Sequence, residues 1–362
     1  MARPWTRCAN VHHQDRRRVS SLAVRLSSST VAATDAPQAP KRVFITGALG
    51  FIGRRLAERY RATGAEVAGM DVRADPAAGV VGGDITQQGT WQEAMAGADL
   101  VIHTAALLGM GADEEAFWRA NVLGTRNAVD AAARAGVRRF VHLSSIVVFG
   151  FDFPDGVDER YPPRPNGVPY VDTKVASEQV VLAAHASGEV AATVVRPGDV
   201  YGPGSHFWTI TPVREIAARR FVLPAMGRSL VSPVFVDDLV EGIVLAAGRE
   251  EGAGEVFILT GARSVEIREF FAHYARMLGR RRVPSAPTGA IVALAALAGR
   301  IGVGSEEVTA SGVRYLARKG GYSIAKARSL LGYEPQVDVQ EGMRHCEQWL
   351  RAEGILPSSA GP

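Results

Sequence analysis

Short apolar runs and longer helical patterns alternate along most of this chain. The first apolar run, residues 41–47, ends at a glycine and is typical of a buried strand. A helical pattern over residues 51–63 follows and stops at Gly64, and a second strand-like run covers residues 66–72. Strand, helix and strand in succession indicate an α/β protein with a parallel sheet.

The same alternation continues along the first two thirds of the chain. Further strands are predicted at residues 99–105, 139–149 and 191–196, with helices between them at 113–135 and 170–187. We therefore predict an α/β fold, in which a Rossmann doubly wound parallel sheet carries helices on both faces. A smaller, mostly helical C-terminal lobe is expected to hold the substrate.

The pattern changes after Pro197, where loops rich in Gly and Pro are interleaved with a helix near 209–219 and a strand at 255–261. The chain is therefore expected to divide into several parts. These parts are a disordered or targeting extension (1–40), a Rossmann domain (41–200, with returning elements at 233–262), a substrate-binding lobe (201–232 and 263–355) and a flexible tail (356–362).

Basic residues are concentrated in the first forty positions. That segment holds six Arg and two Asp, which leaves 35 basic and 35 acidic groups in the rest of the chain. The body has no basic excess, so nucleic acid is not an expected partner. The Arg- and Ser-rich extension has the composition of a transit peptide, of an unfolded extension, or of sequence upstream of a misassigned start codon.

The cellular location is predicted from the cysteines and from the composition of the first forty residues. The two cysteines, Cys8 and Cys346, lie near opposite ends and form neither a disulfide framework nor a metal site, which favours a reducing environment. We predict a cytoplasmic location, with an organelle as the alternative if the extension is a transit peptide. No segment has the roughly 18 apolar residues of a membrane span, and no cluster has metal-ligand spacing.

A glycine-rich loop separates the first strand from the first helix. Gly47, Gly50 and Gly53 have the spacing of a dinucleotide-binding turn, with Phe51 and Ile52 between the last two. The glycines permit a tight turn and a close approach of the backbone to a pyrophosphate, and the helix N-terminus supplies N–H groups for the phosphates.

Acidic residues follow the next strands. Asp71 ends the second strand and can accept hydrogen bonds from both ribose hydroxyls, which favours NAD over NADP. Arg73 lies two residues later and could pair with a 2′-phosphate, so NADP stays open. Asp84 with Ile85 could close on the adenine, although Asp84 also suits a plain turn.

Taken together, these motifs resemble the extended short-chain dehydrogenase/reductases, the superfamily branch that holds the NAD-dependent epimerase/dehydratase family. The similar segments come in family order: TGALGFIG at 46–53, HTAA at 103–106, NVLGTRN at 121–127, SSIVVFG at 144–150, YVDTK at 170–174, RPGDVYGPG at 196–204, FVDDLV at 235–240 and YSIAKARSLLGYEP at 322–335. The resemblance is closest to the 3β-hydroxysteroid dehydrogenase-like subgroup and implies an enzyme.

Tyr170 and Lys174 are the candidate acid/base pair. They are four residues apart on a predicted helix, so both side chains lie on one face. A free phenol has a pKa near ~10, and a nearby ammonium is expected to lower it, so that Tyr170 exchanges a proton with an alcohol or a ketone. The resemblance implies that Lys174 also holds the nicotinamide ribose.

Ser145 occupies the position of the family's catalytic Ser or Thr, with Ser144 as the rival assignment. Its hydroxyl is expected to orient the substrate oxygen. The resemblance adds four cofactor-binding positions: Ala105, Ala106, Asn121 and Pro197. Asn121 also suits a buried structural amide.

Several other polar residues are interpreted as structural. His103 and His142 lie in predicted strands, where a satisfied core imidazole is the expected state. Asp237 and Asp238 come just before a helical pattern and are predicted to cap its N-terminus.

The sequence indicates the substrate less specifically than it indicates the fold and the cofactor. Nucleotide-sugar members of the family usually carry Asn at the position of Asp199, and the dehydratases carry an acidic pair where this chain has Ile146 and Val147. The apolar stretch 286–299 resembles the hydroxysteroid-like subgroup. Phe207, Trp208 and Met226 are candidate pocket residues, with ordinary core packing as the alternative.

We therefore predict an oxidoreductase that interconverts a secondary alcohol and a ketone on an apolar, steroid-like or long-chain small molecule. The alternatives are a nucleotide-sugar epimerase with tightly bound NAD and a non-catalytic NAD(P)-binding sensor. A homodimer is expected through the helices near 113–135 and 170–187, as in many family members. The three basic residues Arg280–Arg282 precede the apolar stretch, and this pattern is also compatible with a weak contact with a membrane surface.

Overall fold

A seven-stranded parallel sheet forms the centre of the computed structural model, which describes residues 39–110, 113–300 and 309–357. All but the last two residues of the predicted extension, and most of the predicted tail, lie outside the described residues. Every strand pair in the sheet is parallel, and the spatial order is β3-β2-β1-β4-β5-β6-β10, so the Rossmann prediction is confirmed. The strands are β1 (Arg42–Thr46), β2 (Glu66–Asp71), β3 (Val80–Gly82), β4 (Leu100–His103), β5 (Arg139–Leu143), β6 (Ala192–Pro197) and β10 (Val256–Leu259).

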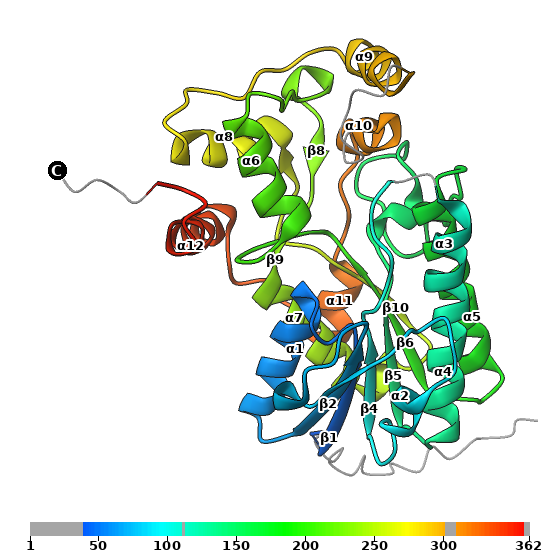
Figure 1. Cartoon of the computed structure of the whole chain (residues 1–362). Coiled ribbons are helices and arrows are strands. Elements are labelled where there is room, and N and C mark those ends of the chain that lie inside the picture. The colour runs from blue at the N-terminus through cyan, green and yellow to red at the C-terminus, as the bar shows by residue number, and fades with distance from the viewer. Residues whose placement is uncertain (1–38, 111–112, 301–308, 358–362) are drawn as a thin grey trace, which may run out of the picture. The chain divides into compact units, whose positions relative to one another are not determined.

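Helices cover both faces of this sheet (Figure 1). One layer contains α1 (Phe51–Ala62), α7 (Val236–Gly248) and α11 (Ala325–Leu331), and the other contains α2 (Thr90–Glu93), α3 (Glu114–Trp118), α4 (Gly124–Arg134) and α5 (Pro169–Ala186). Successive strand residues point to opposite faces. In β1, the side chains of Val43 and Ile45 pack into the hydrophobic core on one face of the sheet, whereas Phe44 packs into the core on the other face. This explains why the strands read as continuous apolar runs.

The predicted strand at 139–149 is wrong in its second half. β5 ends at Leu143, and residues Ile146–Phe149 form a buried 3₁₀ turn. The Oγ of Ser145 accepts the Val147 N–H at 3.2 Å, which bends the chain out of the sheet although the residues stay apolar. The bend places Ser145 just beyond the carboxyl end of the sheet.

The predicted helix at 113–135 contains a π turn, Arg119–Leu123, between α3 and α4. A π turn inserts an extra residue and is frequent at functional sites. Here it carries Asn121, which is 2% exposed and faces the protein interior.

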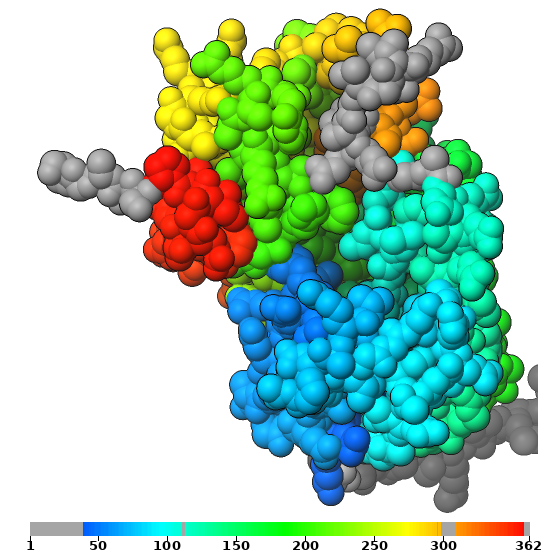
Figure 2. Space-filling model, in the orientation of Figure 1, coloured from blue at the N-terminus to red at the C-terminus, as the bar shows by residue number. Residues whose placement is uncertain are grey.

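Most elements after β6, apart from α7, β10 and α11, build a second group around the end of the sheet. Two small sheets pair β7 (Asp199–Tyr201) with β9 (Pro233–Phe235) and β8 (Leu230–Val231) with β11 (Val265–Glu266). Five helices accompany them: α6 (Thr211–Ala217), α8 (Ile267–Met277), α9 (Thr288–Arg300), α10 (Ala310–Leu316) and α12 (Val339–Ala352). Figure 2 shows the yellow and amber segments of this group gathered away from the blue residues that begin the sheet. None of the helices in the described ranges is both long and apolar enough to span a membrane.

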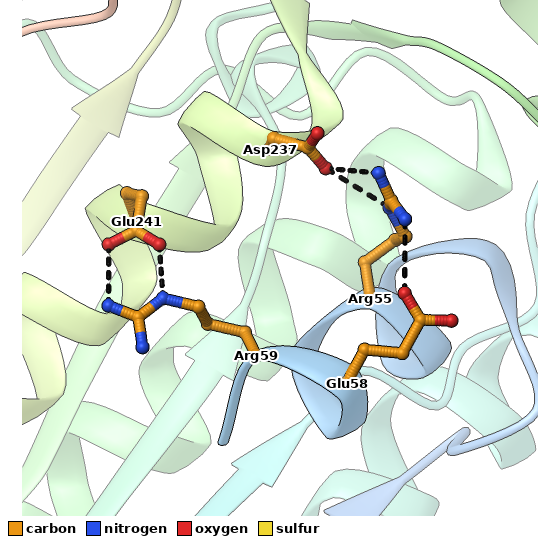
Figure 3. A network of polar contacts seen from close by, with 5 residues as sticks. All are labelled: Arg55, Glu58, Arg59, Asp237 and Glu241. Atoms are coloured by element: carbon orange, nitrogen blue, oxygen red, sulfur yellow. Dashed lines mark hydrogen bonds and ion pairs between the residues drawn. The ribbon is translucent and has the colours of Figure 1, made fainter. Parts of the chain in front are cut away.

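An ion-pair network joins α1 to α7 (Figure 3). Arg55 donates to Asp237 at 2.7 and 3.0 Å and to Glu58 at 3.0 Å, and Arg59 pairs with Glu241 through both carboxylate oxygens. These partly exposed pairs orient α1, whose N-terminus follows the glycine turn.

The predicted capping role of Asp237 and Asp238 is therefore wrong. α7 begins at Val236 with Phe235 at the N-cap, so both carboxylates lie inside the first turn. Asp238 instead accepts the N–H groups of Gln336 at 2.9 Å and Val337 at 3.0 Å, and thereby holds the segment that leads into α12.

A buried ion pair joins α5 to β6. Arg196 donates to Glu178 at 2.8 and 2.7 Å, and the two side chains are 4% and 0% exposed. The guanidinium also lies 4.8 Å from the ring centre of Phe149. Loss of one partner of a buried pair leaves an uncompensated charge in the interior.

We predict that Arg196→Met lowers the free energy of unfolding by about 3–5 kcal/mol, because Glu178 then loses its buried partner. Arg59→Ala removes a partly exposed pair and should cost less than about 1 kcal/mol. Urea denaturation of the two variants and the wild type measures both values. Equal losses in the two variants would contradict the assignment of the stabilising pair to the interior.

Candidate active site

The glycine turn after β1 is closely packed. Gly47 has a φ of +69°, and a Cβ there would lie 2.8 Å from Thr104 Oγ1 and 2.9 Å from the Ala105 nitrogen. A Cβ on Gly53 would collide with the Gly47 carbonyl oxygen. Both positions therefore require glycine, and the turn brings the start of α1 against the end of β4.

The start of α1 fits the pyrophosphate of a dinucleotide. Gly50 occupies the N-cap and no side chain caps this helix end, so its first N–H groups stay available to a ligand. Phe51 and Ile52 are the first two residues of α1, and both are partly buried against the hydrophobic core that contains Val43 and Ile45. No Cβ narrows the approach at Gly47, Gly50 or Gly53.

Asp71 stands at the end of β2 beside this turn. Its carboxylate accepts the Leu49 N–H at 2.9 Å and the Val72 N–H at 2.8 Å, which ties the glycine loop to the second strand. The acidic group thus lies at the crevice edge of the sheet, where Rossmann proteins bind the adenosine ribose.

Asp84 and Ile85 lie on the next connection, and they differ in exposure. Asp84 is exposed and accepts the Thr86 N–H at 2.8 Å, which is the geometry of a plain turn. The Ile85 side chain is buried against Gly124 of α4, where a Cβ would lie 2.7 Å from its Cγ2. Neither contact by itself indicates an adenine site.

His103, at the end of β4, is held on both sides of its ring. Nδ1 lies 2.7 Å from Thr46 Oγ1 and Nε2 lies 3.0 Å from Thr125 Oγ1, and burial lowers the pKa of His103 to about 3. The ring is therefore neutral and structural. Ala105 follows, donating its N–H to Thr46 Oγ1 at 3.3 Å, and both it and Ala106 are partly buried next to the glycine turn.

His142, one strand further, places Nε2 3.0 Å from Ser177 Oγ, and burial holds the pKa of His142 well below its usual range. Burial also explains why neither imidazole is available as an acid at neutral pH.

All the polar atoms of the Asn121 amide have partners within the protein. Oδ1 accepts the Leu107 N–H at 2.7 Å, and Nδ2 donates to the Leu107 carbonyl and to Thr173 Oγ1, both at 3.1 Å. The amide therefore joins the loop after β4 to α5. Through Thr173, the amide is bonded to the helix that carries Tyr170.

The Ser145 hydroxyl interacts with the Tyr170 phenol and lowers its pKa, against the larger effect of burial. Tyr170 lies in the first turn of α5 and is partly buried, with the Phe117 ring 6.2 Å away. Ser144 is buried and its Oγ has no hydrogen-bond partner among the described residues. The structure thus brings Ser145, rather than Ser144, to the phenol.

Lys174 lies one helical turn after Tyr170 and is 3% exposed. Its Nζ donates to the Leu143 carbonyl at the end of β5, at 2.8 Å. Burial lowers the pKa of Lys174 to about 8, while Glu178 on the same helix raises it.

The expected lowering of the Tyr170 pKa is not observed. Burial raises the pKa of Tyr170 to about 12, and only the Ser145 hydroxyl opposes that rise. Lys174, whose ammonium donates to the Leu143 carbonyl, is not among the groups that shift this pKa. The spacing of four residues placed both side chains on one helix, but desolvation decides the proton affinity.

An apolar cluster surrounds the phenol. Val147, Val168 and Val171 form its buried part, and Met110, Phe151, Tyr170 and Tyr315 pack against it. Pro197 is buried at the end of β6, in register with Leu259 of β10. Of the three proposed pocket residues, Phe207 and Met226 are 45% and 53% exposed, and the Trp208 ring lies 6.5 Å from Tyr315.

Sequence analysis missed the polar group beside this cluster. Asp199, Tyr315 and Arg318 are joined by a hydrogen bond and an ion pair, although more than a hundred residues separate the first from the others. The Asp in place of the family's usual Asn at position 199 was the one available signal. In the part of the chain that the structure describes, no group of His, Cys, Asp and Glu side chains could hold a metal.

This parallel sheet with its glycine turn, and a tyrosine and lysine one turn apart, has the arrangement of an extended short-chain dehydrogenase/reductase. The profile of the NAD dependent epimerase/dehydratase family matches residues 43–259. The chain therefore belongs to that family. It is an NAD-dependent oxidoreductase of the extended short-chain type, and NAD is its cofactor.

Two relatives illustrate the range of named activities. A 4-hydroxy-2-methyl-3-oxo-4-farnesyl-3,4-dihydroquinoline-1-oxide ketoreductase of Stigmatella aurantiaca is 33% identical over 88% of this chain and 100% of its own length. A 3-beta-hydroxysteroid dehydrogenase of Mycolicibacterium neoaurum is 30% identical over 84% of this chain and 90% of its own. Among solved structures, MoeE5 in complex with UDP-glucuronic acid and NAD is 26% identical, with a TM-score of 0.71, over 86% of this chain and 99% of that one.

We predict that Gly53→Ala abolishes measurable NAD binding, because its Cβ would collide with the Gly47 carbonyl oxygen and push α1 away from the turn. Gly64→Ala is the matched control, since Gly64 also has a positive φ (+84°) but no atom within 4 Å of the added Cβ. It should melt at a lower temperature and still bind NAD. Calorimetric titration and thermal melting check both; normal NAD affinity in Gly53→Ala would show that the turn tolerates a side chain.

Proposed function

We propose that this enzyme interconverts a secondary alcohol and a ketone on an apolar small molecule, with Ser145, Tyr170 and Lys174 as the catalytic residues. The observation that carries the proposal is the interaction of the Ser145 hydroxyl with the Tyr170 phenol, which packs on an apolar cluster one helical turn before the buried Lys174. When bound, NAD supplies the hydride acceptor for oxidation and, as NADH, the hydride donor for reduction.

Each side chain has a separate task in this proposal. The Ser145 hydroxyl orients the substrate oxygen, and the Tyr170 phenol takes the proton from the alcohol or returns it to the ketone. Lys174 holds the nicotinamide ribose and stabilises the phenolate as it forms. Because burial raises the pKa of Tyr170 to about 12, the positive charge of Lys174 has to favour the phenolate during the reaction.

The cofactor lies along the crevice edge of the sheet in this proposal. The glycine turn and the start of α1 would hold its pyrophosphate, and Asp71 would accept hydrogen bonds from the adenosine ribose hydroxyls. The backbone around Ala105, Ala106 and Pro197 lines the nicotinamide side. Asp84 and Ile85 border the adenine, and Asn121 acts by holding the loop after β4 against α5.

The apolar substrate class is supported by two independent observations. Tyr170 is packed among Val147, Val168, Val171 and other apolar side chains rather than among charged ones. The ketoreductase and hydroxysteroid dehydrogenase relatives are named for farnesylated and steroid substrates. Elements beyond β6 would then form the substrate-binding lobe.

Epimerisation of a nucleotide sugar is the second candidate, because the MoeE5 structure contains a UDP-sugar and NAD. One assay separates the two functions. Net NADH formation with a 3β-hydroxysteroid or a long-chain secondary alcohol supports the proposed function. Conversion of a UDP-hexose without net change in NADH supports the second.

We predict that Tyr170→Phe lowers kcat/KM at least about a hundredfold, because the general acid/base is lost, while NAD affinity changes less than about threefold. Steady-state NADH formation and NAD titration measure the two effects. Tyr161→Phe is the matched control, since Tyr161 is also partly buried and its hydroxyl has no part in the proposal. Full turnover in Tyr170→Phe would remove Tyr170 from the mechanism.

A homodimer is part of the proposal. An apolar groove runs over the π turn and its neighbours, lined by Trp118, Arg119, Val122, Leu123, Arg126 and Val180. Trp118 and Leu123 are 39% and 46% exposed there, which is unusual for large apolar side chains and typical of a contact surface. The groove lies on the two helical segments through which many family members pair.

We predict that Leu123→Glu converts the dimer to a monomer in sedimentation velocity, because a carboxylate would be buried at the centre of the contact. Leu330→Glu is the control, since Leu330 on α11 is 41% exposed and lies outside the groove. A wild-type protein that sediments as a monomer at tens of micromolar would contradict the dimer.

A further inference from the structure

Asp199 is a buried carboxylate that the proposed chemistry does not use. It is 1% exposed and begins β7, two residues after the end of β6. Its Oδ2 accepts the Ser232 N–H at 2.7 Å and is paired with Arg318, and its Oδ1 accepts the Tyr315 hydroxyl at 2.6 Å. Three donors from two distant parts of the chain therefore meet at this one carboxylate.

Arg318 has its charge balanced at this point. Its side chain is fully buried and forms the ion pair with Asp199, while Nη1 donates to the Tyr315 carbonyl at 3.1 Å. The carbonyl of Arg318 accepts the Leu230 N–H at 2.9 Å, which binds the residue to β8. The Arg318 guanidinium is thus held inside the protein by these contacts and is not directed toward a ligand.

Asp199 and Arg318 together fix the position of the Tyr315 side chain. The Arg318 guanidinium lies 4.2 Å from the centre of the Tyr315 ring, and Phe151 and Trp208 approach the same ring edge-on at 5.8 and 6.5 Å. With its hydroxyl bonded to Asp199, the ring is constrained on several sides and has little rotational freedom.

The ring also belongs to the cluster that contains the candidate proton donor. Tyr315 and Tyr170 both pack against the Val147, Val168 and Val171 cluster, and Tyr315 is itself only partly buried. The helix α10, although far from α5 in the sequence, therefore contributes an aromatic surface next to the reacting position.

We propose that Tyr315, held by Asp199 and Arg318, is a specificity-determining residue that forms a rigid aromatic wall for the apolar body of the substrate. The inference rests on the proposed function, because it places the substrate carbon next to Tyr170. A diphosphate requires unpaired cations or free N–H donors. The wall offers instead a ring face and an arginine already neutralised by Asp199, so it favours an uncharged, apolar substrate.

The test compares Tyr315→Ala with Tyr315→Phe, using a 3β-hydroxysteroid (pregnenolone) and cyclohexanol as substrates. Tyr315→Ala should raise KM for the steroid at least about tenfold with kcat changed less than threefold, since a buried aromatic contact is lost but the chemistry is not. Tyr315→Phe keeps the ring and should stay within about threefold of wild type. The loss in Tyr315→Ala should be smaller for cyclohexanol than for the steroid, because cyclohexanol has less apolar surface to pack against the ring.

Equilibrium binding gives a readout that does not depend on turnover. Titration of the NAD-loaded protein with pregnenolone should show the same tenfold weakening in Tyr315→Ala, with thermal melting to establish that the variant is folded. Unchanged pregnenolone affinity in folded Tyr315→Ala would overturn the inference. A wild-type protein that binds UDP-glucose more tightly than pregnenolone, or that binds neither, would also overturn it.

The two proposals fail in different ways in this experiment. An active Tyr170→Phe variant removes the proposed base, yet pregnenolone titration of Tyr315→Ala still reports on the wall. An inactive Tyr170→Phe variant together with a Tyr315→Ala variant of unchanged KM leaves the catalytic residues in place and rejects Tyr315 alone.

Discussion

Parallel pairing of the central strands is the constraint on which the rest of the structure depends. The register places Thr46 beside His103 and His103 beside His142, so β1, β4 and β5 end at one level of the sheet. Whatever follows these strands must then meet at one edge. The glycine turn, the Ala105–Ala106 backbone and Ser145 are neighbours for this reason, although about a hundred residues separate the first from the last.

Buried charged side chains attach the helix α5 to the central sheet. Lys174 is directed to the Leu143 carbonyl, and Arg196 pairs with Glu178 one turn further along α5. Such groups are costly to bury unless each has a partner, so their positions leave little room for alternative packing. The helix that carries Tyr170 is therefore attached to both β5 and β6, which limits how far the phenol can move from Ser145.

In the proposed function and the inference about Tyr315, the chemistry and the selection of substrate come from different parts of the chain. Ser145, Tyr170 and the glycine turn lie in the first half, where the strands and helices alternate. Tyr315 and Arg318 come from α10 and the residues after it. The Tyr315 ring packs on the same apolar cluster as Tyr170, and both Tyr315 and Arg318 are joined to Asp199. This division lets the reacting groups stay constant while the wall opposite them changes, as is common in folds that carry many activities.

The sequence by itself determined the features that depend on near neighbours. Strand and helix periodicity, the glycine spacing after β1 and the four-residue spacing of Tyr170 and Lys174 are local, so the Rossmann fold, NAD and the family could be predicted from them. Only the tertiary structure decided the bend at Ser145, the partners of Asp237 and Asp238, the raised pKa of Tyr170 and the group around Asp199. Each of these depends on burial, or on contacts between residues far apart in the chain, and neither has a periodic pattern in sequence.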